Sequence, residues 1–300
     1  ADVAAKEHPT LTATRNGNPI DDRGRAILLV DQTLVTGTNT ITAELDAFKR
    51  LLAADGWTVT NYFVPRHVDR IYNDWSCANY ATNGWPINVT NLAAIKALIR
   101  GEYTNHLTAT NVVMIIGHVP IPYSGALSPP EDGHSGCSGT DHDGAWVADS
   151  WYGDLTGTWT DTLTQGNCNQ CINGNSPGDG RWDQATLPLE SDGAPCRLEV
   201  PLGRIDFAGL PAFLDEDSGL PQPVANNADA ERKLFKRYFD KVQRFRRDEI
   251  GYVEDSRLWL AGYKFATMAD SAQRLNSHLW GSPITDSTRL SQDMFLATTN

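Results

Sequence analysis

The sequence predicts an α/β protein in which helices cover a mostly parallel sheet. Three short apolar segments, 26–30, 57–64 and 111–117, alternate with two segments whose apolar residues recur at helical spacing. Short apolar runs rich in β-branched residues favour strands over helices. Strands that alternate with amphipathic helices are typical of a parallel sheet, because each helix carries the chain back to the edge of the sheet at which the next strand begins.

The first strand and the first helix follow from burial and spacing. Residues 26–30 (AILLV) are uniformly apolar and end at Asp31, as expected of a strand buried on both faces. Apolar residues then recur at helical spacing from Ile41 to Leu52, and Gly56 is a natural stop for this helix.

The next three elements repeat this alternation. Residues 57–64 (WTVTNYFV) have the β-branched and aromatic composition of a strand. A second amphipathic helix is predicted with Thr90 as its N-cap and with Leu92 and Ile99 on its apolar face. Residues 111–117 (NVVMIIG) form the third predicted strand.

Regular patterning then stops, and we interpret residues 118–196 as a long loop-rich insertion. An irregular stretch of this length in a compact domain is usually a functional insertion or a sign that its elements are misassigned. A strand is predicted over 197–206 (RLEVPLGRID), and the strongest helix of the chain over 228–247. A further strand at 257–262 and a helix at 268–280 follow.

The long helix has two predicted faces. The apolar face includes Phe235, Phe239 and Phe245 and is expected to be buried. The opposite face is basic and is interpreted as a solvated surface. The residues of that basic face are Arg232, Lys233, Lys236, Arg237 and Arg244.

These elements divide the chain into three parts. Residues 1–25 are a polar N-terminal arm, and residues 26–250 form a first α/β subdomain that contains the insertion 118–196. Residues 251–300 are interpreted as the start of a second α/β subdomain, which is incomplete at Asn300.

Charge and composition exclude some partners. The net charge of −12 argues against nucleic acid as a partner, since a binder of phosphate backbones needs a cationic face. The longest apolar stretch, 112–116, is far shorter than the roughly 20 residues of a membrane-spanning helix, so no membrane span is expected. The nine tryptophans, the few lysines and the acidic balance favour a secreted or cell-surface protein. The start without Met is interpreted either as the removal of a signal peptide or as a trimmed sequence.

A histidine directly after the third strand is a candidate functional residue. His118 lies in Gly-His-Val-Pro-Ile-Pro-Tyr-Ser-Gly (117–125), and residues just beyond the carboxyl ends of parallel strands line the ligand crevice. The alternative interpretation is a histidine that only hydrogen-bonds its own loop.

The insertion also contains candidate metal ligands. Aspartates alternating with glycines can wrap a Ca²⁺ ion, which takes six to eight oxygen ligands. The candidate calcium ligands are Asp143, Asp149, Asp154 and Asp161. His134 and His142, together with His118, are candidates for a transition metal, although the sequence has no HExxH. The alternative is a loop held by Asx-turns, which Asp and Gly also favour.

Four of the five cysteines lie near the glycine- and asparagine-rich part of the insertion. These four are the disulfide candidates Cys137, Cys168, Cys171 and Cys196, and Cys77 is the fifth. The 168–171 pair has the CxxC spacing of redox and zinc sites, but its turn-rich flanks favour a structural disulfide. The sequence has no P-loop and no Gln-Ala-Cys-x-Gly.

Five segments together resemble the gingipain-like cysteine peptidases, peptidase family C25. In chain order they are GHVPIPYSG (117–125), GAWVADSWYGD (144–154), GTWTD (157–161), LGRID (202–206) and KRYFDK (236–241). The resemblance covers roughly residues 24–280 and is carried by the ordered set, since no single motif is decisive.

The resemblance implies a caspase-like three-layer α/β sandwich in two subdomains, often with bound calcium. It also implies cleavage of peptide bonds in a polypeptide substrate by a Cys/His dyad. In the family the histidine lies in a Gly-His-Gly segment of the second subdomain and the cysteine follows the next strand. His118 matches a post-strand position of the first subdomain instead, and Asp149 matches an acidic position near the substrate cleft.

Three functions remain open from the sequence. The first is a portion of a secreted bacterial C25-like endopeptidase whose dyad is expected beyond Asn300. The second is a non-catalytic extracellular binding or structural module, because fold alone does not imply function. The third is a metal-dependent hydrolase. Its candidate residues are His118, His134, His142 and Asp149.

Overall fold

A computed structural model describes the chain in separate stretches. These are residues 6–7, 11, 14–15, 18–19, 22–68, 85–125, 145–163, 175–184, 186–188, 197–208, 224–247 and 249. The chain divides into two compact units, Ala1–Ile250 and Gly251–Asn300, and every described residue lies in the first. The strand predicted at 257–262 and the helix predicted at 268–280 lie outside the described residues.

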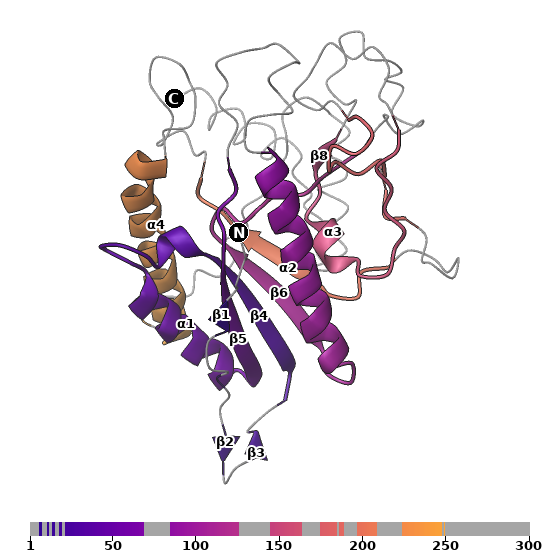
Figure 1. Ribbon diagram of the computed structural model, residues 1–300. Coiled ribbons are helices and arrows are strands. Elements are labelled where there is room, and N and C mark those ends of the chain that lie inside the picture. Colours follow the sequence, from indigo (N-terminus) through magenta and orange to yellow (C-terminus); the bar gives the residue numbers. More distant parts are fainter. Residues whose placement is uncertain are drawn as a thin grey trace, which may run out of the picture. The chain divides into compact units, whose positions relative to one another are not determined.

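The core of the first unit is a sheet with four parallel strands, β4 (Gly24–Asp31), β5 (Trp57–Val64), β6 (Asn111–Ile116) and β9 (Leu202–Ile205) (Figure 1). The strand order is β5-β4-β6-β9, and β1 (Lys6–Glu7) pairs antiparallel with the outer edge of β5. The prediction of an α/β fold with a mostly parallel sheet is confirmed.

The central strand β4 is buried on both faces, as its uniformly apolar sequence predicts. Successive side chains of a strand point to opposite faces. Ile27 and Leu29 therefore join one hydrophobic cluster, and Leu28 and Val30 join another. All four side chains are fully buried.

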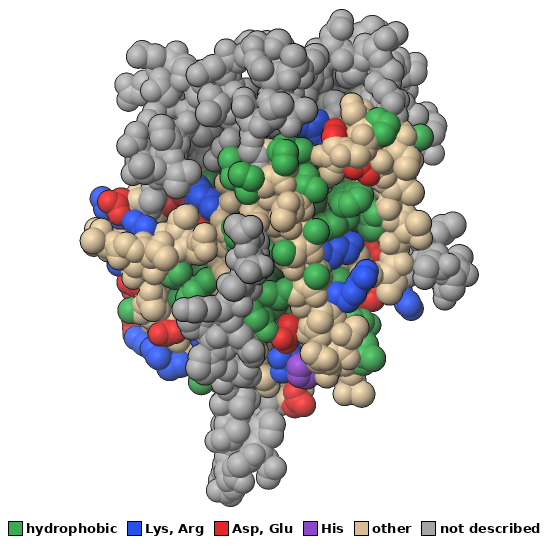
Figure 2. All heavy atoms as spheres, in the orientation of Figure 1, with side chains coloured by type: hydrophobic (Ala, Val, Ile, Leu, Met, Phe, Trp, Pro, Cys, Tyr) green, Lys and Arg blue, Asp and Glu red, His purple; other side chains and the backbone are tan. Residues whose placement is uncertain are grey.

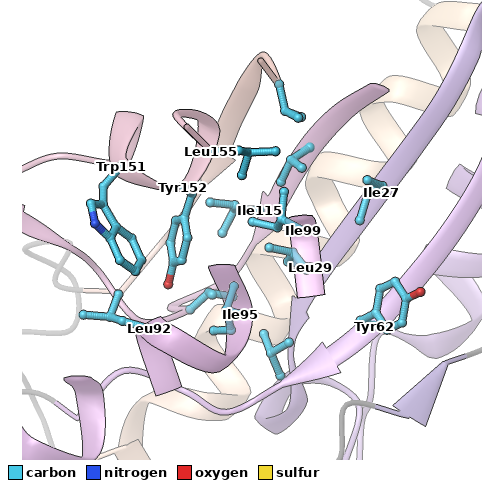
Figure 3. Packing of buried hydrophobic residues seen from close by; sticks show 14 residues of the cluster. Ile27, Leu29, Tyr62, Leu92, Ile95, Ile99, Ile115, Trp151, Tyr152 and Leu155 are labelled. Carbon is cyan, nitrogen blue, oxygen red and sulfur yellow. The ribbon is translucent and has the colours of Figure 1, made fainter. Parts of the chain in front are cut away.

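Helices pack on each of these clusters. The face with Leu28 is covered by α1 (Thr42–Ala54) and α4 (Val224–Arg246). The face with Ile27 is covered by α2 (Trp85–Asn105) and the short α3 (Ser150–Gly153), whose packed side chains are drawn in Figure 3.

Smaller elements lie around the sheet. The 3-10 helix η1 (Gln32–Leu34) follows β4 directly. The pair β2 (Thr14–Arg15) and β3 (Asn18–Pro19) is antiparallel, as is the pair β7 (Tyr123–Ser124) and β8 (Trp146–Val147). In the described stretches of the chain, every helix is too short or too polar to cross a bilayer.

The second helix begins earlier than the sequence analysis expected. The α2 helix starts at Trp85, and Pro86 occupies its first turn, where the missing N–H has no helical partner to lose. Thr90 is therefore not the N-cap. Its hydroxyl instead donates to the Pro86 carbonyl at 3.0 Å from inside the helix.

The expected strand at 197–206 is also shorter than predicted. Leu202–Ile205 form the strand that pairs with β6, because the residues before them bond to the end of α3 and to the segment after it. There the Val200 N–H donates to the Gly153 carbonyl at 3.1 Å, and Glu199 accepts the Leu155 N–H at 2.7 Å. The predicted helix stop at Gly56 is confirmed, with a φ of 96°.

Two assignments on the long helix are wrong. Arg232 is buried, because its guanidinium donates to the carbonyls of Thr33 and Thr36 at 2.6 and 2.8 Å. Phe245 is 56% exposed, whereas Phe235 lies fully in the core. Over the face in Figure 2, the described basic side chains lie scattered among acidic ones without a continuous basic patch.

Candidate functional site

Four strand ends bring polar side chains to the carboxyl edge of the sheet. Asp31 ends β4, Arg66 and His67 follow β5, His118 follows β6, and Asp206 follows β9. β5 and β6 lie on opposite sides of β4 in the sheet. The connection after β4 therefore leads to one side of it, and the connection after β5 leads to the other side. Such a topological switch point is where open α/β sheets bind ligands.

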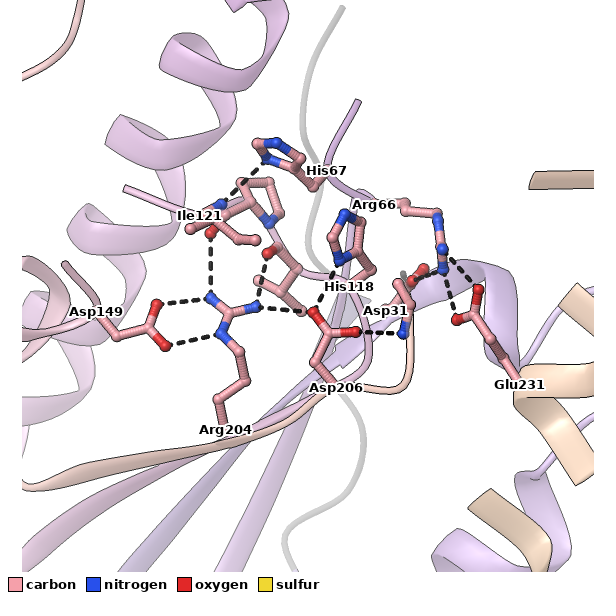
Figure 4. Close-up of polar contacts among 12 residues, drawn as sticks. Asp31, Arg66, His67, His118, Ile121, Asp149, Arg204, Asp206 and Glu231 are labelled. Atoms are coloured by element: carbon pink, nitrogen blue, oxygen red, sulfur yellow. Dashed lines mark hydrogen bonds and ion pairs between the residues drawn. The ribbon is translucent and has the colours of Figure 1, made fainter. Parts of the chain in front are cut away.

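Further residues from β9, α4 and the start of α3 join this edge (Figure 4). We define the carboxyl-edge cluster as Asp31, Arg66, His67, His118, Asp149, Arg204, Asp206 and Glu231. Most of these side chains are buried. Each has a charged partner or a hydrogen bond that holds it in place.

The backbone before His118 requires glycine. Gly117 has a φ of 89°, in the left-handed region that L side chains rarely adopt. A Cβ at this position would lie 2.6 Å from the Asp31 Cβ and 2.7 Å from the Leu34 Cδ1. The close approach of these two strand ends therefore depends on Gly117.

His118 is oriented by an aspartate that sequence analysis did not identify. Its Nδ1 lies 2.7 Å from the Asp206 Oδ2. Burial alone would raise the pKa of Asp206, but the hydrogen bond and charge of His118, with help from Arg204, hold that pKa below its usual value. Since the carboxylate can only accept, Nδ1 carries a proton and the remaining basic atom of the ring is Nε2.

His67 is held in the opposite tautomer. Its Nδ1 accepts the Ile121 N–H at 3.2 Å, so the proton of the neutral ring is on Nε2. The backbone N–H of His67 donates to the His118 carbonyl at 2.6 Å. The two rings meet edge to face, with centroids 5.1 Å apart.

Arg204 fastens the segment after His118. The guanidinium Nε and Nη2 each lie 2.7 Å from a carboxylate oxygen of Asp149, and Nη1 donates to the Val119 carbonyl at 2.8 Å. Burial would lower the pKa of Arg204, but the hydrogen bonds and charge of Asp149 raise it above its usual value. The buried Tyr152 hydroxyl, whose pKa burial raises, donates to the Pro120 carbonyl at 2.8 Å.

A second arginine joins three elements at the other side of the cluster. Arg66 donates to Asp31 at 2.8 Å and to both carboxylate oxygens of Glu231 at 2.9 and 2.7 Å. Burial opposes its charge, but Glu231 and Asp31 together raise the pKa of Arg66. Two fully buried carboxylates therefore share one guanidinium, and α4 is tied to the sheet edge.

Two predicted calcium ligands lie in hydrogen-bonded loops outside the cluster. Asp154 accepts the Gly157 N–H at 2.6 Å and the Trp159 indole N–H at 3.0 Å. Asp161 accepts two backbone N–H groups, both at 2.8 Å, from Gly178 and Gly180. These contacts are of the loop-tying kind that the sequence analysis kept as the alternative.

The predicted metal ligands do not gather within the described stretches, where no group of three His, Cys, Asp or Glu side chains is suited to a metal ion. Asp149 belongs to the carboxyl-edge cluster, but both of its oxygens are bonded to Arg204. The calcium site stays a prediction. The other candidates lie outside the described residues; they are His134, His142, Asp143, Cys137, Cys168, Cys171 and Cys196.

Of the residues in the carboxyl-edge cluster, His118 and Asp149 were predicted from the sequence. The rule that selected His118, a polar residue just past a strand, applies equally to Arg66, His67 and Asp206 and could have found them. Glu231 carries no such signal, because it reaches the cluster through the docking of α4.

Comparisons with known proteins add no relative. No protein-family model, no curated protein and no solved structure matches this chain.

Proposed function

We propose that this chain is part of a secreted gingipain-like cysteine endopeptidase, and that the carboxyl-edge cluster forms one wall of its peptide-binding cleft. The observation that carries the proposal is the meeting of three motif segments. Segments 117–125, 144–154 and 202–206 each resemble the C25 peptidases, and Arg204 hydrogen-bonds to the other two. If the three segments form one site, that explains why motifs so far apart in the sequence are found in the same chain.

The fold supports this proposal in its arrangement. Helices on both faces of a mostly parallel sheet are compatible with the caspase-like three-layer sandwich of that family. The polar edge lies at the switch point, where such sheets bind their substrates.

The proposed role of the cluster is to hold backbone rather than to attack the substrate. Arg204, Tyr152 and His67 fix the backbone of residues 119–121 through separate hydrogen bonds. Rigid positioning of this kind keeps an extended substrate in register for cleavage. None of the described residues is a cysteine, and the nucleophile is the one that the sequence analysis expects beyond Asn300.

Hydrolysis by the protein from its native source tests the proposal. Fluorescent casein is incubated with the protein before and after alkylation by iodoacetamide, and separately with EDTA. We expect alkylation to abolish cleavage, because the thiolate is the nucleophile. Cleavage that survives alkylation but disappears with EDTA would contradict the proposal.

A matched pair of variants tests the role of the cluster. Arg204→Lys removes the bidentate contact with Asp149 and should lower kcat/KM about tenfold or more. Arg197→Lys changes an exposed arginine near the same strand and should leave cleavage unchanged. Equal activities of the two variants would exclude Arg204 from the cleft.

Metal-dependent hydrolysis is a second candidate that one observation favours. An aspartate on Nδ1, as Asp206 is on His118, is the usual second contact of a metal-binding histidine. The engagement of both Asp149 oxygens by Arg204 weighs against the four-residue set suggested by the sequence. Elemental analysis showing no stoichiometric zinc, manganese or iron would remove this candidate.

A further inference from the structure

The antiparallel strands β7 and β8, the latter labelled in Figure 1, are held at one end by the carboxyl-edge cluster. β7 follows residues 119–121, where the Val119 carbonyl accepts a hydrogen bond from Arg204. β8 runs directly into Asp149, whose carboxylate binds the same guanidinium. One arginine therefore positions both strands beside the wall of the proposed cleft.

β7 has a neighbour on each side, and β8 is the outer one of the two. On one side the Trp182 N–H donates to the Tyr123 carbonyl at 3.0 Å, and the Trp182 carbonyl accepts the Gly125 N–H at 2.8 Å. On the other side Tyr123 lies opposite Val147 of β8. The far edge of β8 is therefore an edge of this small sheet.

The register of the two strands shows which backbone groups face outward. In an antiparallel pair, opposite residues that exchange hydrogen bonds alternate with opposite residues that do not. The Ala148 N–H donates to the Pro122 carbonyl at 2.8 Å, so this pair is bonded across the ladder. The next pair, Val147 with Tyr123, is the unbonded kind, and the Val147 N–H and C=O point away from β7. Within the described residues neither group has a hydrogen-bond partner.

The side chains of β8 are apolar but exposed. Trp146 is 46% and Val147 is 62% exposed, whereas Ala145 just before them is fully buried. Successive side chains of a strand point to opposite faces, so a strand added at this edge would meet an apolar side chain on each face. The outer edge of β5, by contrast, is already paired with β1. An exposed edge with unpaired N–H and C=O groups is a template for another extended chain.

We propose that β8 binds the substrate as an added strand, with one residue of an extended peptide exchanging two hydrogen bonds with the Val147 N–H and C=O. The proposal rests on the proposed function, because it names the strand along which the cleft holds its substrate. An extended polypeptide is the ligand that fits, since it alone offers a backbone donor and acceptor at the matching spacing. Trp146 and Val147 favour apolar or β-branched side chains beside the paired residue.

Binding of N-methylated peptides to the 300-residue chain tests this pairing. The probe is fluorescein-Gly-Thr-Val-Thr-Val-Thr-amide, and its binding is followed by fluorescence anisotropy. N-methyl groups on all five threonine and valine residues remove the backbone donors, and should weaken binding about tenfold or more. A single N-methyl group on the last threonine leaves the other residues able to pair, and should change binding by about twofold or less. Equal binding of the two methylated peptides, or no binding of the unmethylated probe, overturns the proposal.

Variants of Val147 place the peptide on β8. Val147→Pro removes the outward N–H but leaves the ladder to β7 intact, because proline is tolerated at edge positions whose N–H faces solvent. We expect this variant to bind the probe about tenfold more weakly. Val147→Thr keeps the N–H and the β-branched shape and should bind within about twofold of the unchanged chain. Equal binding by Val147→Pro and Val147→Thr would exclude β8 as the site.

Hydrogen exchange gives a test on the unchanged chain, which does not depend on the folding of a variant. Saturating probe should slow exchange of the Val147 N–H about tenfold or more, because the added strand accepts that hydrogen. The Ala148 N–H is already bonded to Pro122 and should change little. Unchanged exchange at Val147 overturns the proposal.

Two further measurements separate this proposal from its alternatives. Sedimentation velocity without probe detects pairing of β8 with a second copy of the chain, and a dimer that Val147→Pro dissociates would replace the peptide proposal. Casein cleavage by the protein from its native source reports on the proposed function alone. Probe binding at β8 without thiol-dependent casein cleavage would contradict the proposed function and leave the binding site in place. Thiol-dependent cleavage without probe binding at β8 would contradict the binding site and leave the proposed function in place.

Discussion

The two ends of the parallel sheet both carry charged side chains, but their charges balance differently. At the amino end, Arg25 pairs with Glu102 at 2.7 Å, and the Tyr62 hydroxyl donates to the same carboxylate at 2.5 Å. One guanidinium thus meets one carboxylate. At the carboxyl end, Arg66 donates to both Asp31 and Glu231, and these two carboxylates are completely buried.

This difference separates a structural contact from a candidate site. The Arg25–Glu102 pair at the amino end balances one positive charge with one negative charge. The carboxyl-edge cluster has four carboxylates but only two guanidiniums, and its other two members are histidines. Titratable surplus charge in a buried cluster is typical of functional sites.

The largest expected effect comes from breaking the buried group at the carboxyl end. Arg66→Met leaves Asp31 and Glu231 buried without their shared cation, and should lower the free energy of unfolding by about 3–5 kcal/mol. Urea unfolding followed by circular dichroism measures it. Arg25→Met at the amino end is the matched control, and a loss as large as that of Arg66→Met would erase the contrast between the two ends.

The second effect concerns the segment after His118. Arg204→Lys keeps the positive charge but loses the bidentate contact with Asp149, and should lower the free energy of unfolding by about 1–3 kcal/mol. Hydrogen exchange of the Ile121 N–H should also become faster, because the nearby Val119 carbonyl loses its hydrogen bond from Arg204 and the segment opens more often. Unchanged exchange at Ile121 would show that Arg204 does not fasten this segment.

The third effect depends on pH. The pKa of Asp206 is lower in the folded than in the unfolded protein, so its stabilising contribution is present above the unfolded pKa of about 3.9 and is lost as the pH falls through the folded value. Asp206→Asn should therefore cost about 1 kcal/mol at pH 6 and less at pH 3. Asp240→Asn, at an exposed position, is the control. A cost that does not shrink in acid contradicts the His118–Asp206 pairing.

The smallest effect belongs to an exposed ion pair between α4 and the residue that follows α1. Arg246 contacts Asp55 at 2.5 Å, but the arginine is 43% exposed. Arg246→Gln should change the free energy of unfolding by no more than about 1 kcal/mol, because solvent screens the pair. A loss comparable with that of Arg66→Met would mean that burial is not what distinguishes the carboxyl end.

Local patterns predicted the sheet well because each central strand is buried along most of its length. Residues 26–30, 57–64 and 111–117 contain almost only residues suited to that environment, and all three are strands in the structure. The start of α2 was missed because Pro86 acts as a helix starter there, and Thr90 offered a competing cap.

The site was less predictable because its partners are distant in the chain. His118 could be selected from its place after a strand, but its partner Asp206 is brought there by the pairing of β9 with β6. Arg232 was assigned to a solvated surface, since a helical repeat shows which residues share a face but not what packs against it. In the structure, the carbonyls of Thr33 and Thr36, which follow β4, accept hydrogen bonds from Arg232 on this face of α4.

The place of β9 in the sheet has a consequence for the order of folding. β4 pairs with β5 across a separation of about 30 residues, but the β4–β6 and β6–β9 pairings each span about 90. Closing either of the longer loops costs more chain entropy, and contacts between residues far apart in sequence form slowly. Since β9 pairs with the sheet through β6, we expect the β4–β5 pair to form before β6 and β9 join. His118, Arg204 and Asp206 then reach the cluster late, so a newly made chain would hold its first two parallel strands before it has a completed site.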